Sequence, residues 1–195
     1  MLNWFKPRVN TGSVSAEIES LLQHFDYQGL TDQNDPINRI AMDIMRDDFN
    51  QRLTGSAYLN IYGFKAQGSQ FYLCERVTSN AFETGRRMCI LTTGKSFPLG
   101  FEVTDGDDYD YINSNCELVT STDDWDVLAE DRDEYERQKD FLNFLLPHFA
   151  RFAERSTPIS FFAFPQDHLL GYHVSARQIT AEEADSAVAI MQRFP

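Results

Sequence analysis

The residues of this chain best placed for acid–base chemistry are Asp167, His168 and His173, which lie close together in the sequence. An aspartate beside a histidine can orient the imidazole so that it acts as a general base. The histidine spacing differs from the i, i+4 spacing of a helical zinc pair, and the sequence contains no GxSxG nucleophile turn. Ordinary turn polarity explains the three residues as well. A hydrolase that uses them, or a metal held by carboxylates, is therefore the alternative hypothesis.

A second candidate is TTGKS at Thr92–Ser96, which resembles the end of a phosphate-binding loop. The full motif needs a glycine five residues before Gly94, and that position is Cys89. A helix must also follow the loop, whereas here the sequence continues as FPLG. We therefore predict a turn between strands at this place, and we expect no cofactor.

The segment DGDDYDYINSNCE, which begins at Asp105, suggests a calcium loop. Asp105 and Asp107 fit the first and third positions of an EF-hand. The sixth position, which needs glycine, is Asp110, and the twelfth, which needs a bidentate glutamate, is Cys116. The segment is therefore not an EF-hand, and no metal ligand is predicted from it. An irregular calcium or magnesium site stays open, because hard cations need only several oxygen ligands.

Negative charge is concentrated in one part of the chain, residues 102–136, called here the acidic window. It holds 14 acidic residues and one basic residue, Arg132, so it accounts for the whole net charge of −13. A concentrated negative field steers positively charged partners and speeds their association. The same field opposes binding of nucleic acids and of anionic membrane surfaces.

Aromatic residues are interleaved with these acids, which a purely solvating segment would lack. Tyrosine and tryptophan are common interface anchors and stack on arginine. We therefore predict a partner-binding segment in which aspartates steer a cationic protein and aromatics supply contact area: Asp105, Asp107, Asp108, Tyr109, Asp110, Tyr111, Asp123, Asp124, Trp125 and Asp126. Two simpler interpretations stay open. The acids can be a hydrophilic coat, and the aromatics can point into the core.

Apolar periodicity predicts four helices to position these residues. The first has Ser15 as its N-cap and Ile18, Leu21 and Leu22 on its apolar side; the second starts at Pro36, after an aspartate cap, and runs to about Leu53. A long helix is expected from Asp124, with a kink or break near Leu146 because Pro147 follows. The last begins with the capping-box pair Thr180 and Glu183.

Alternating segments predict the strands, over 56–64, 69–77, 87–93, 99–103, 116–121, 158–165 and 169–176. The first two form a hairpin around KAQG, and the last two form a hairpin around PQDH. We expect an α+β fold with a single antiparallel, meander-type sheet of about five to seven strands. The N-terminal, middle and C-terminal helices pack on it. We expect residues 1–195 to form one domain and residues 1–14 to be a flexible N-terminus.

Composition narrows the class of protein. We expect no membrane span, because no apolar run is long enough, and we expect no secretory signal in MLNWFKPRVNTGS, because no apolar run follows its basic residues. The three cysteines, Cys74, Cys89 and Cys116, are widely spaced, which suits a reducing cytoplasm. We expect a non-enzymatic cytoplasmic protein that binds a cationic protein surface, such as an immunity-type inhibitor of a toxin or a secretion chaperone. DNA mimicry and a homo-oligomer buried through FFAF, residues 161–164, are further hypotheses.

Overall fold

The computed structural model describes residues 8–9, 16–32, 34–45, 56–79, 84–105, 112, 115–122, 125–150, 159–175 and 177–195. Its helices are α1 (Ala16–Leu22), α2 (Pro36–Ile44), α3 (Arg132–Ala150) and α4 (Ala181–Met191). Its strands are β1 (Arg8–Val9), β2 (Asp26–Leu30), β3 (Ser56–Ala66), β4 (Ser69–Ser79), β5 (Thr84–Thr93), β6 (Phe101–Thr104), β7 (Glu117–Ser121), β8 (Asp126–Ala129), β9 (Ile159–Phe164) and β10 (Leu169–Ser175).

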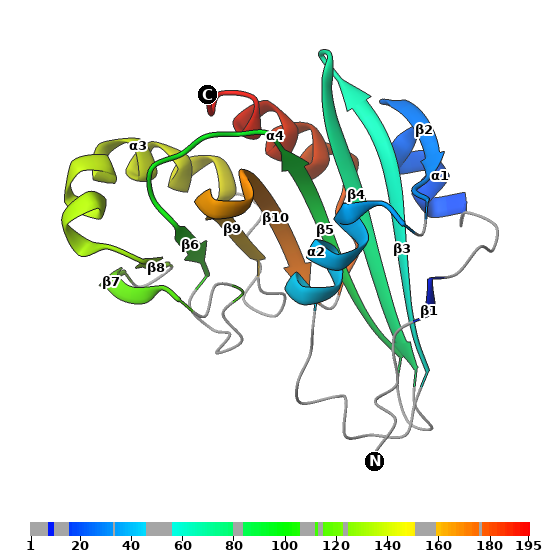
Figure 1. Ribbon diagram of the computed structural model, residues 1–195, viewed down its shortest axis with the longest axis horizontal. Helices are drawn as coiled ribbons and strands as arrows, with labels where there is room; N and C mark the ends of the chain where they lie inside the picture. The colour runs from blue at the N-terminus through cyan, green and yellow to red at the C-terminus, as the bar shows by residue number, and fades with distance from the viewer. Residues whose placement is uncertain are drawn as a thin grey trace.

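One sheet joins all the described strands (Figure 1). Nine of them follow one another in the order β1-β3-β4-β5-β10-β9-β6-β8-β7, and β2 pairs antiparallel with β3 beyond this path. The neighbours are antiparallel, apart from the short parallel pair of β1 with β3. The α+β class with a single sheet is thus confirmed, whereas the expected five to seven strands are too few.

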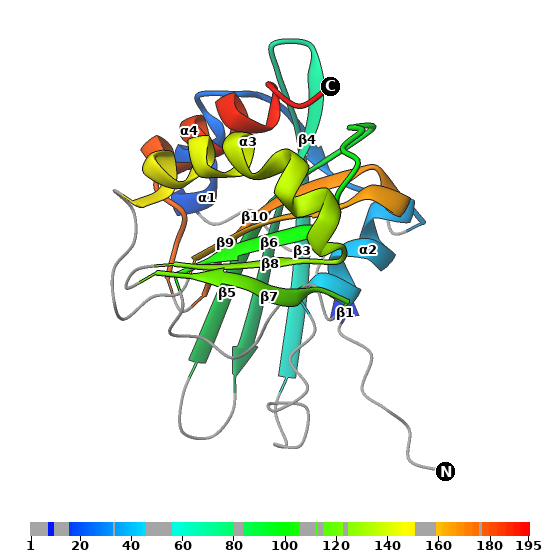
Figure 2. The ribbon, with the colours of Figure 1, turned by 90° about the vertical axis from the view of Figure 1, so that its left-hand side faces the viewer.

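Helices cover the two faces of the sheet unequally. Side chains of α1, α3 and α4 pack into the larger core on one face, and Figure 2 shows these helices together on one side. The helix α2 packs against the other face, over β3, β4 and β5, with Ile37, Ala41 and Ile44 in a second, smaller core. The sheet is therefore the middle layer, because apolar side chains alternate to both of its faces.

Local sequence patterns produce the expected helices. In α1, Ile18, Leu21 and Leu22 are buried, as the helical period requires. Asp35 caps α2 by accepting a hydrogen bond from the Ile37 amide at 3.0 Å. The expected end of this helix, near Leu53, is wrong, because α2 ends at Ile44 with Met45 as its C-cap. The starts of both helices are confirmed.

The capping box of α4 is also confirmed, and it extends into a buried network. The Glu183 carboxylate accepts hydrogen bonds from the Thr180 amide at 2.8 Å and from the Tyr172 hydroxyl at 2.9 Å. Arg177 donates to both carboxylate oxygens, at 2.6 and 2.7 Å. Burial raises the pKa of Glu183, but these hydrogen bonds outweigh burial and lower it below its ordinary value. The network ties α4 to β10.

Both hairpins form where the alternating segments predict them. In the first, β3 and β4 pair from Ser56 opposite Ser79 to Ala66 opposite Ser69. In the second, a short 3₁₀ turn, Pro165–Asp167, joins β9 to β10. The FFAF segment lies in β9, and Phe161 and Phe162 are fully buried within this single chain. These rings are therefore used in the chain's own core.

The expected meander is wrong beyond β5. Residues 99–103 were expected to pair directly after β5, joined through Gly94. Instead the hairpin β9–β10 lies between β5 and β6, pairing with both. Gly94 has a φ of +78°, which suits a turn, and the Lys95 side chain donates to the Phe194 carbonyl at 2.7 Å. TTGKS is thus a turn that leads out of a strand, but the next strand in sequence is not its neighbour.

The expected long helix from Asp124 is also corrected. Residues 126–129 form β8, which pairs with β6 and β7, and α3 begins only at Arg132. Asp131 caps the helix, accepting a hydrogen bond from the Glu134 amide at 2.9 Å. The helix then continues through Pro147 to Ala150, so the break expected near Leu146 is absent. The short segment DVLA can form a strand because β6 and β7, on its two sides, satisfy the hydrogen bonds of its backbone.

Candidate functional site

The described part of the acidic window gathers at one end of the sheet. Nine of its 14 acids are described, and they come from β6, β7, β8, the turn after β8 and the start of α3. The strands β6, β8 and β7 are consecutive neighbours, and Figure 1 shows β7 and β8 at the end opposite β1 and β2. The described part of the window is therefore one region of the molecule and not several.

Most of the residues predicted to bind a partner lie outside the described residues: Asp107, Asp108, Tyr109, Asp110, Tyr111, Asp123 and Asp124. For these the prediction stays a prediction. Asp105 is half-buried directly after β6. Asp126 is half-buried in β8, opposite Thr104 of β6 and Ser121 of β7.

Trp125 lies in the core and not on a surface. Only 6% of it is exposed, and it belongs to the larger core cluster. The Trp125 amide donates to the Thr122 hydroxyl at 3.0 Å, and the Trp125 carbonyl accepts from the Thr122 amide at 2.8 Å. These bonds close the hairpin between β7 and β8. The interpretation in which interleaved aromatics turn inward is the one that holds for this residue.

Four exposed acids that the sequence analysis did not single out lie at this end of the sheet, and we call the surface they share at its edge the acidic face: Glu117, Glu130, Asp131 and Asp133. Glu117 is opposite Ala129 in the β7–β8 pair, and Glu130 and Asp131 follow directly after Ala129. Asp133 lies in the first turn of α3. Their gathering at the start of β7 depends on strand pairing, which no local sequence pattern shows.

Other acids of the window are neutralised or buried. Glu134 pairs with Arg137 at 2.5 Å, and Glu136 pairs with Lys139 at 2.7 Å. Hydrogen bonds from Gln138 and Arg137 lower the pKa of Glu134. Glu102 is fully buried in β6. The charge available to a partner in the described region is therefore mainly that of the acidic face.

The strand β7 forms the edge of the sheet beside the acidic face. Within the described residues it pairs only with β8. Leu118 is 48% exposed, which is unusual for a large apolar side chain in a strand. Edge strands present backbone groups that can pair with another chain. This edge and the acidic face are continuous.

The structure does not bring Asp167, His168 and His173 together. Asp167 and His168 are exposed at the turn between β9 and β10. His173 is buried five residues further on, about 16 Å along an extended strand. Burial, and then the charge of Arg87, lowers the pKa of His173 to about 3. Such an imidazole is neutral at physiological pH, and it lies between Cys89 and Ser160 of the neighbouring strands.

The cysteines are free thiols. Cys74 and Cys89 lie opposite each other on β4 and β5, fully buried, and Cys116 is half-buried. Burial, followed by the charges of Glu130 and Glu102, raises the pKa of Cys116 to about 12. Among the described residues, no three histidine, cysteine, aspartate or glutamate side chains gather as a metal site. No helix in the described ranges is long and apolar enough to cross a membrane.

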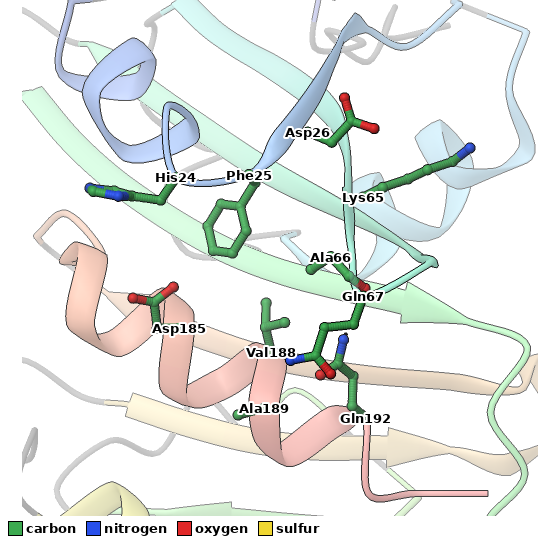
Figure 3. Close-up of a pocket in the computed structure, with 10 residues that line it drawn as sticks. All are labelled: His24, Phe25, Asp26, Lys65, Ala66, Gln67, Asp185, Val188, Ala189 and Gln192. Atoms are coloured by element: carbon green, nitrogen blue, oxygen red, sulfur yellow. Dashed lines mark hydrogen bonds between the residues drawn. The ribbon is translucent and has the colours of Figure 1, made fainter.

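A pocket of about 450 Å³ lies elsewhere, between the start of β2, the β3–β4 turn and α4 (Figure 3). Phe25 and Val188 are the largest of its apolar side chains and point toward one another, while Asp26, Lys65 and Asp185 bring charges of both signs. It shares no residue with the acidic face. Its mixed charge does not single out one class of ligand.

Comparison with known proteins gives little. No protein-family model matches the sequence, and no curated protein matches it. Among solved structures, the mycobacterial trehalose monomycolate transport factor A, TtfA, is similar with a TM-score of 0.48. That alignment has 10% sequence identity and covers 90% of this chain and 89% of the TtfA chain. A similarity at this level assigns neither a family nor a function.

Proposed function

We propose that this protein is a non-enzymatic binding protein whose acidic face docks a cation-rich surface of a protein partner. The observation that carries the proposal is the gathering of Glu117, Glu130, Asp131 and Asp133 around the start of the edge strand β7. An immunity-type inhibitor or a secretion chaperone would use such a face to neutralise a basic partner. The reducing cytoplasm is the compartment we propose, since the cysteines are free thiols.

The electrostatic argument rests on where the charges lie. No ion pair among the described residues neutralises Glu117, Glu130 or Asp133, whereas Glu134 and Glu136 each have a basic partner. Exposed charges gathered at one end of the sheet sum to a field that extends one Debye length, roughly 8–10 Å, at physiological salt. Such a field mainly accelerates association.

The test compares two triple variants that change the net charge equally. Glu117→Gln, Glu130→Gln and Asp133→Asn neutralise the acidic face. Glu19→Gln, Asp43→Asn and Asp185→Asn neutralise exposed acids on α1, α2 and α4. Each tagged protein is used to capture partners from its native cell, and association with the captured basic protein is then timed at several salt concentrations.

The acidic-face variant is expected to associate at least about tenfold more slowly at low salt, with a flatter salt dependence. The control variant should keep most of the rate. Equal slowing by both triples would mean that only the net charge matters, and it would contradict a docking face. Capture of no basic protein by the unmodified chain would count against the proposal as a whole.

A further inference from the structure

The open edge of β7 has backbone groups that face outward at two residues. In an antiparallel pair, hydrogen-bonded and non-hydrogen-bonded residue pairs alternate. Thr122 and Trp125 share a backbone hydrogen bond, so the next pair, Ser121 with Asp126, is non-hydrogen-bonded. The amide and carbonyl of Ser121 therefore point away from β8, toward the open side of the strand.

The same alternation places Leu118 outward. The Glu130 amide donates to the Gly100 carbonyl of the neighbouring chain segment at 2.9 Å, so along β8 the residue Leu128 also directs its backbone toward β6. Leu118 lies opposite Leu128 and forms a non-hydrogen-bonded pair with it. A β-bulge between Leu118 and Thr120 restores the alternation on either side of it.

A cationic side chain already lies on this edge. Arg132, the single base of the acidic window, donates from Nη2 to the Leu118 carbonyl at 3.3 Å. Arg132 is exposed, and its guanidinium comes from the first residue of α3. An exposed arginine contact of this kind contributes little stability. An incoming strand can therefore displace it at small cost and offer its own amide to the same carbonyl.

We infer that an extended, basic segment of a protein partner adds to β7 as a further strand. This inference rests on the proposed function, and it names the partner's chemistry at the same site. Backbone groups of Leu118 and Ser121 would pair with the added strand, which gives affinity without regard to sequence. The carboxylates of the acidic face would select its charge, since opposite charges across strands attract.

Side-chain alternation sets the pattern of the partner segment. Leu118 and Glu117 point to opposite faces of the sheet, because successive side chains alternate. The partner residue beside Leu118 should be apolar, to cover the exposed leucine. Its neighbours should be lysine or arginine, facing Glu117, which points to the same side of the sheet as Ala129. The expected segment therefore alternates apolar and basic residues.

The experiment uses the full chain and a short end-capped peptide of alternating lysine and valine, with binding followed by fluorescence anisotropy. Two further peptides separate the contribution of charge from that of backbone hydrogen bonds. In one, glutamate replaces lysine. In the other, alternate backbone amides are N-methylated, which keeps the charge and removes the donors. Arg132→Ala is compared with Arg137→Ala. Both variants remove one positive charge from α3, but the Arg137 side chain pairs with Glu134 and makes no hydrogen bond to Leu118.

The lysine–valine peptide should bind, and N-methylation should weaken it about tenfold or more, because several backbone hydrogen bonds are lost. The glutamate peptide should not bind measurably. Arg132→Ala should tighten binding several-fold more than Arg137→Ala, because only Arg132 competes for the edge.

If the N-methylated peptide binds as well as the unmodified one, or if the two arginine variants behave alike, strand addition is overturned and the docking face remains. If neutralising the acidic face also leaves partner capture and peptide binding unchanged, the proposed function itself fails. The two failures are thus distinguished by separate measurements.

Discussion

Gly171 shows how one missing side chain fixes the packing between β9 and β10. The ring of the fully buried Phe162 lies over its backbone, and a Cβ at this position would come within 2.1 Å of that ring. Glycine is needed here for space and not for backbone conformation. The tip of the phenyl ring fills the space that a side chain at Gly171, its partner in the register, would occupy.

Gly171→Ala is therefore expected to lower the free energy of unfolding by about 1–3 kcal/mol, as overpacked cores do. Gly63→Ala in β3 is the matched control, because its Cβ would meet only glutamine side chains, that of Gln70 at 3.4 Å and that of Gln28 at 3.8 Å. Urea denaturation of both variants measures the difference. An unchanged midpoint for Gly171→Ala would show that Phe162 moves aside freely.

His173 is a buried imidazole whose Nε2 has no hydrogen-bond partner among the described residues. Its pKa is about 3 in the folded chain, against 6.5 as the ordinary value. Below pH 6.5 the unfolded chain binds a proton that the folded chain does not. Stability is therefore full above that pH and falls as the pH decreases toward 3, by about 1.4 kcal/mol per pH unit.

His173→Leu should flatten this part of the pH dependence while changing the stability at pH 7.5 by less than about 1.5 kcal/mol. His24→Asn, at an exposed position, should leave the dependence as it is. Urea denaturation between pH 4.5 and 7.5, in steps, provides the comparison. A slope that persists in His173→Leu would assign the acid sensitivity to other groups.

At the scale of single elements, the β3–β4 hairpin turns through two residues with positive φ, Gln67 at +50° and Gly68 at +82°. This is the pattern of a type I′ turn, which favours Asn-Gly. The left-handed conformation is sterically unfavourable for glutamine and less so for asparagine.

Gln67→Asn should therefore stabilise the chain by roughly 0.5–1 kcal/mol. Gly68→Ala should destabilise it by a similar or larger amount, since no other residue enters that region as easily. Thermal melting of the two variants should move in opposite directions. Melting temperatures that shift in the same direction in both variants would show that the conformation of this turn does not limit stability.

Elements with strong local signals could be predicted from the sequence. The helix stripe of Ile18, Leu21 and Leu22, the Thr180–Glu183 box and the alternation on both sides of Gln67 each lie within a few residues. The chain makes these choices from near neighbours alone. They are confirmed for that reason.

Elements that depend on distant partners could not be predicted in this way. DVLA has no alternation long enough to mark β8, and the acids around it resemble a helix start. In β2 the sequence DYQGL contains a glycine and little apolar character. The candidate site could be predicted only in part for the same reason. The charge of the sequence located the acidic window, but the burial of Trp125 and the exposure of Leu118 follow from the order of the strands.

At the scale of the whole molecule, Phe194 joins parts of the chain that are far apart in sequence. Its ring is 1% exposed, and its centroid lies 5.1 Å from that of Phe97, 5.0 Å from Phe141 and 5.7 Å from Phe161. The segment after α4 thus holds together α3, β9 and the connection between β5 and β6. Removal of the Phe194 side chain should therefore weaken packing in every part of the larger core.

Phe194→Ala is expected to cost about 3–5 kcal/mol, which is a large share of a typical domain's stability. Phe144→Ala removes the same side chain from an exposed position on α3, where 46% of the residue is accessible, and should cost less than about 1 kcal/mol. Chemical denaturation of both proteins gives the contrast. Comparable losses of stability in the two variants would mean that the buried ring of Phe194 contributes no more to stability than the exposed ring of Phe144.

The hairpin β9–β10, which lies between β5 and β6, has a consequence for how the chain folds. The groups β3–β4–β5 and β6–β7–β8 can each form early from nearby residues. They join only when a segment from 159–175 inserts between them. Non-local strand pairing of this kind is slow. Until it occurs, β5 and β6 both expose a bare strand margin, and the unfinished chain is most prone to aggregate in that interval.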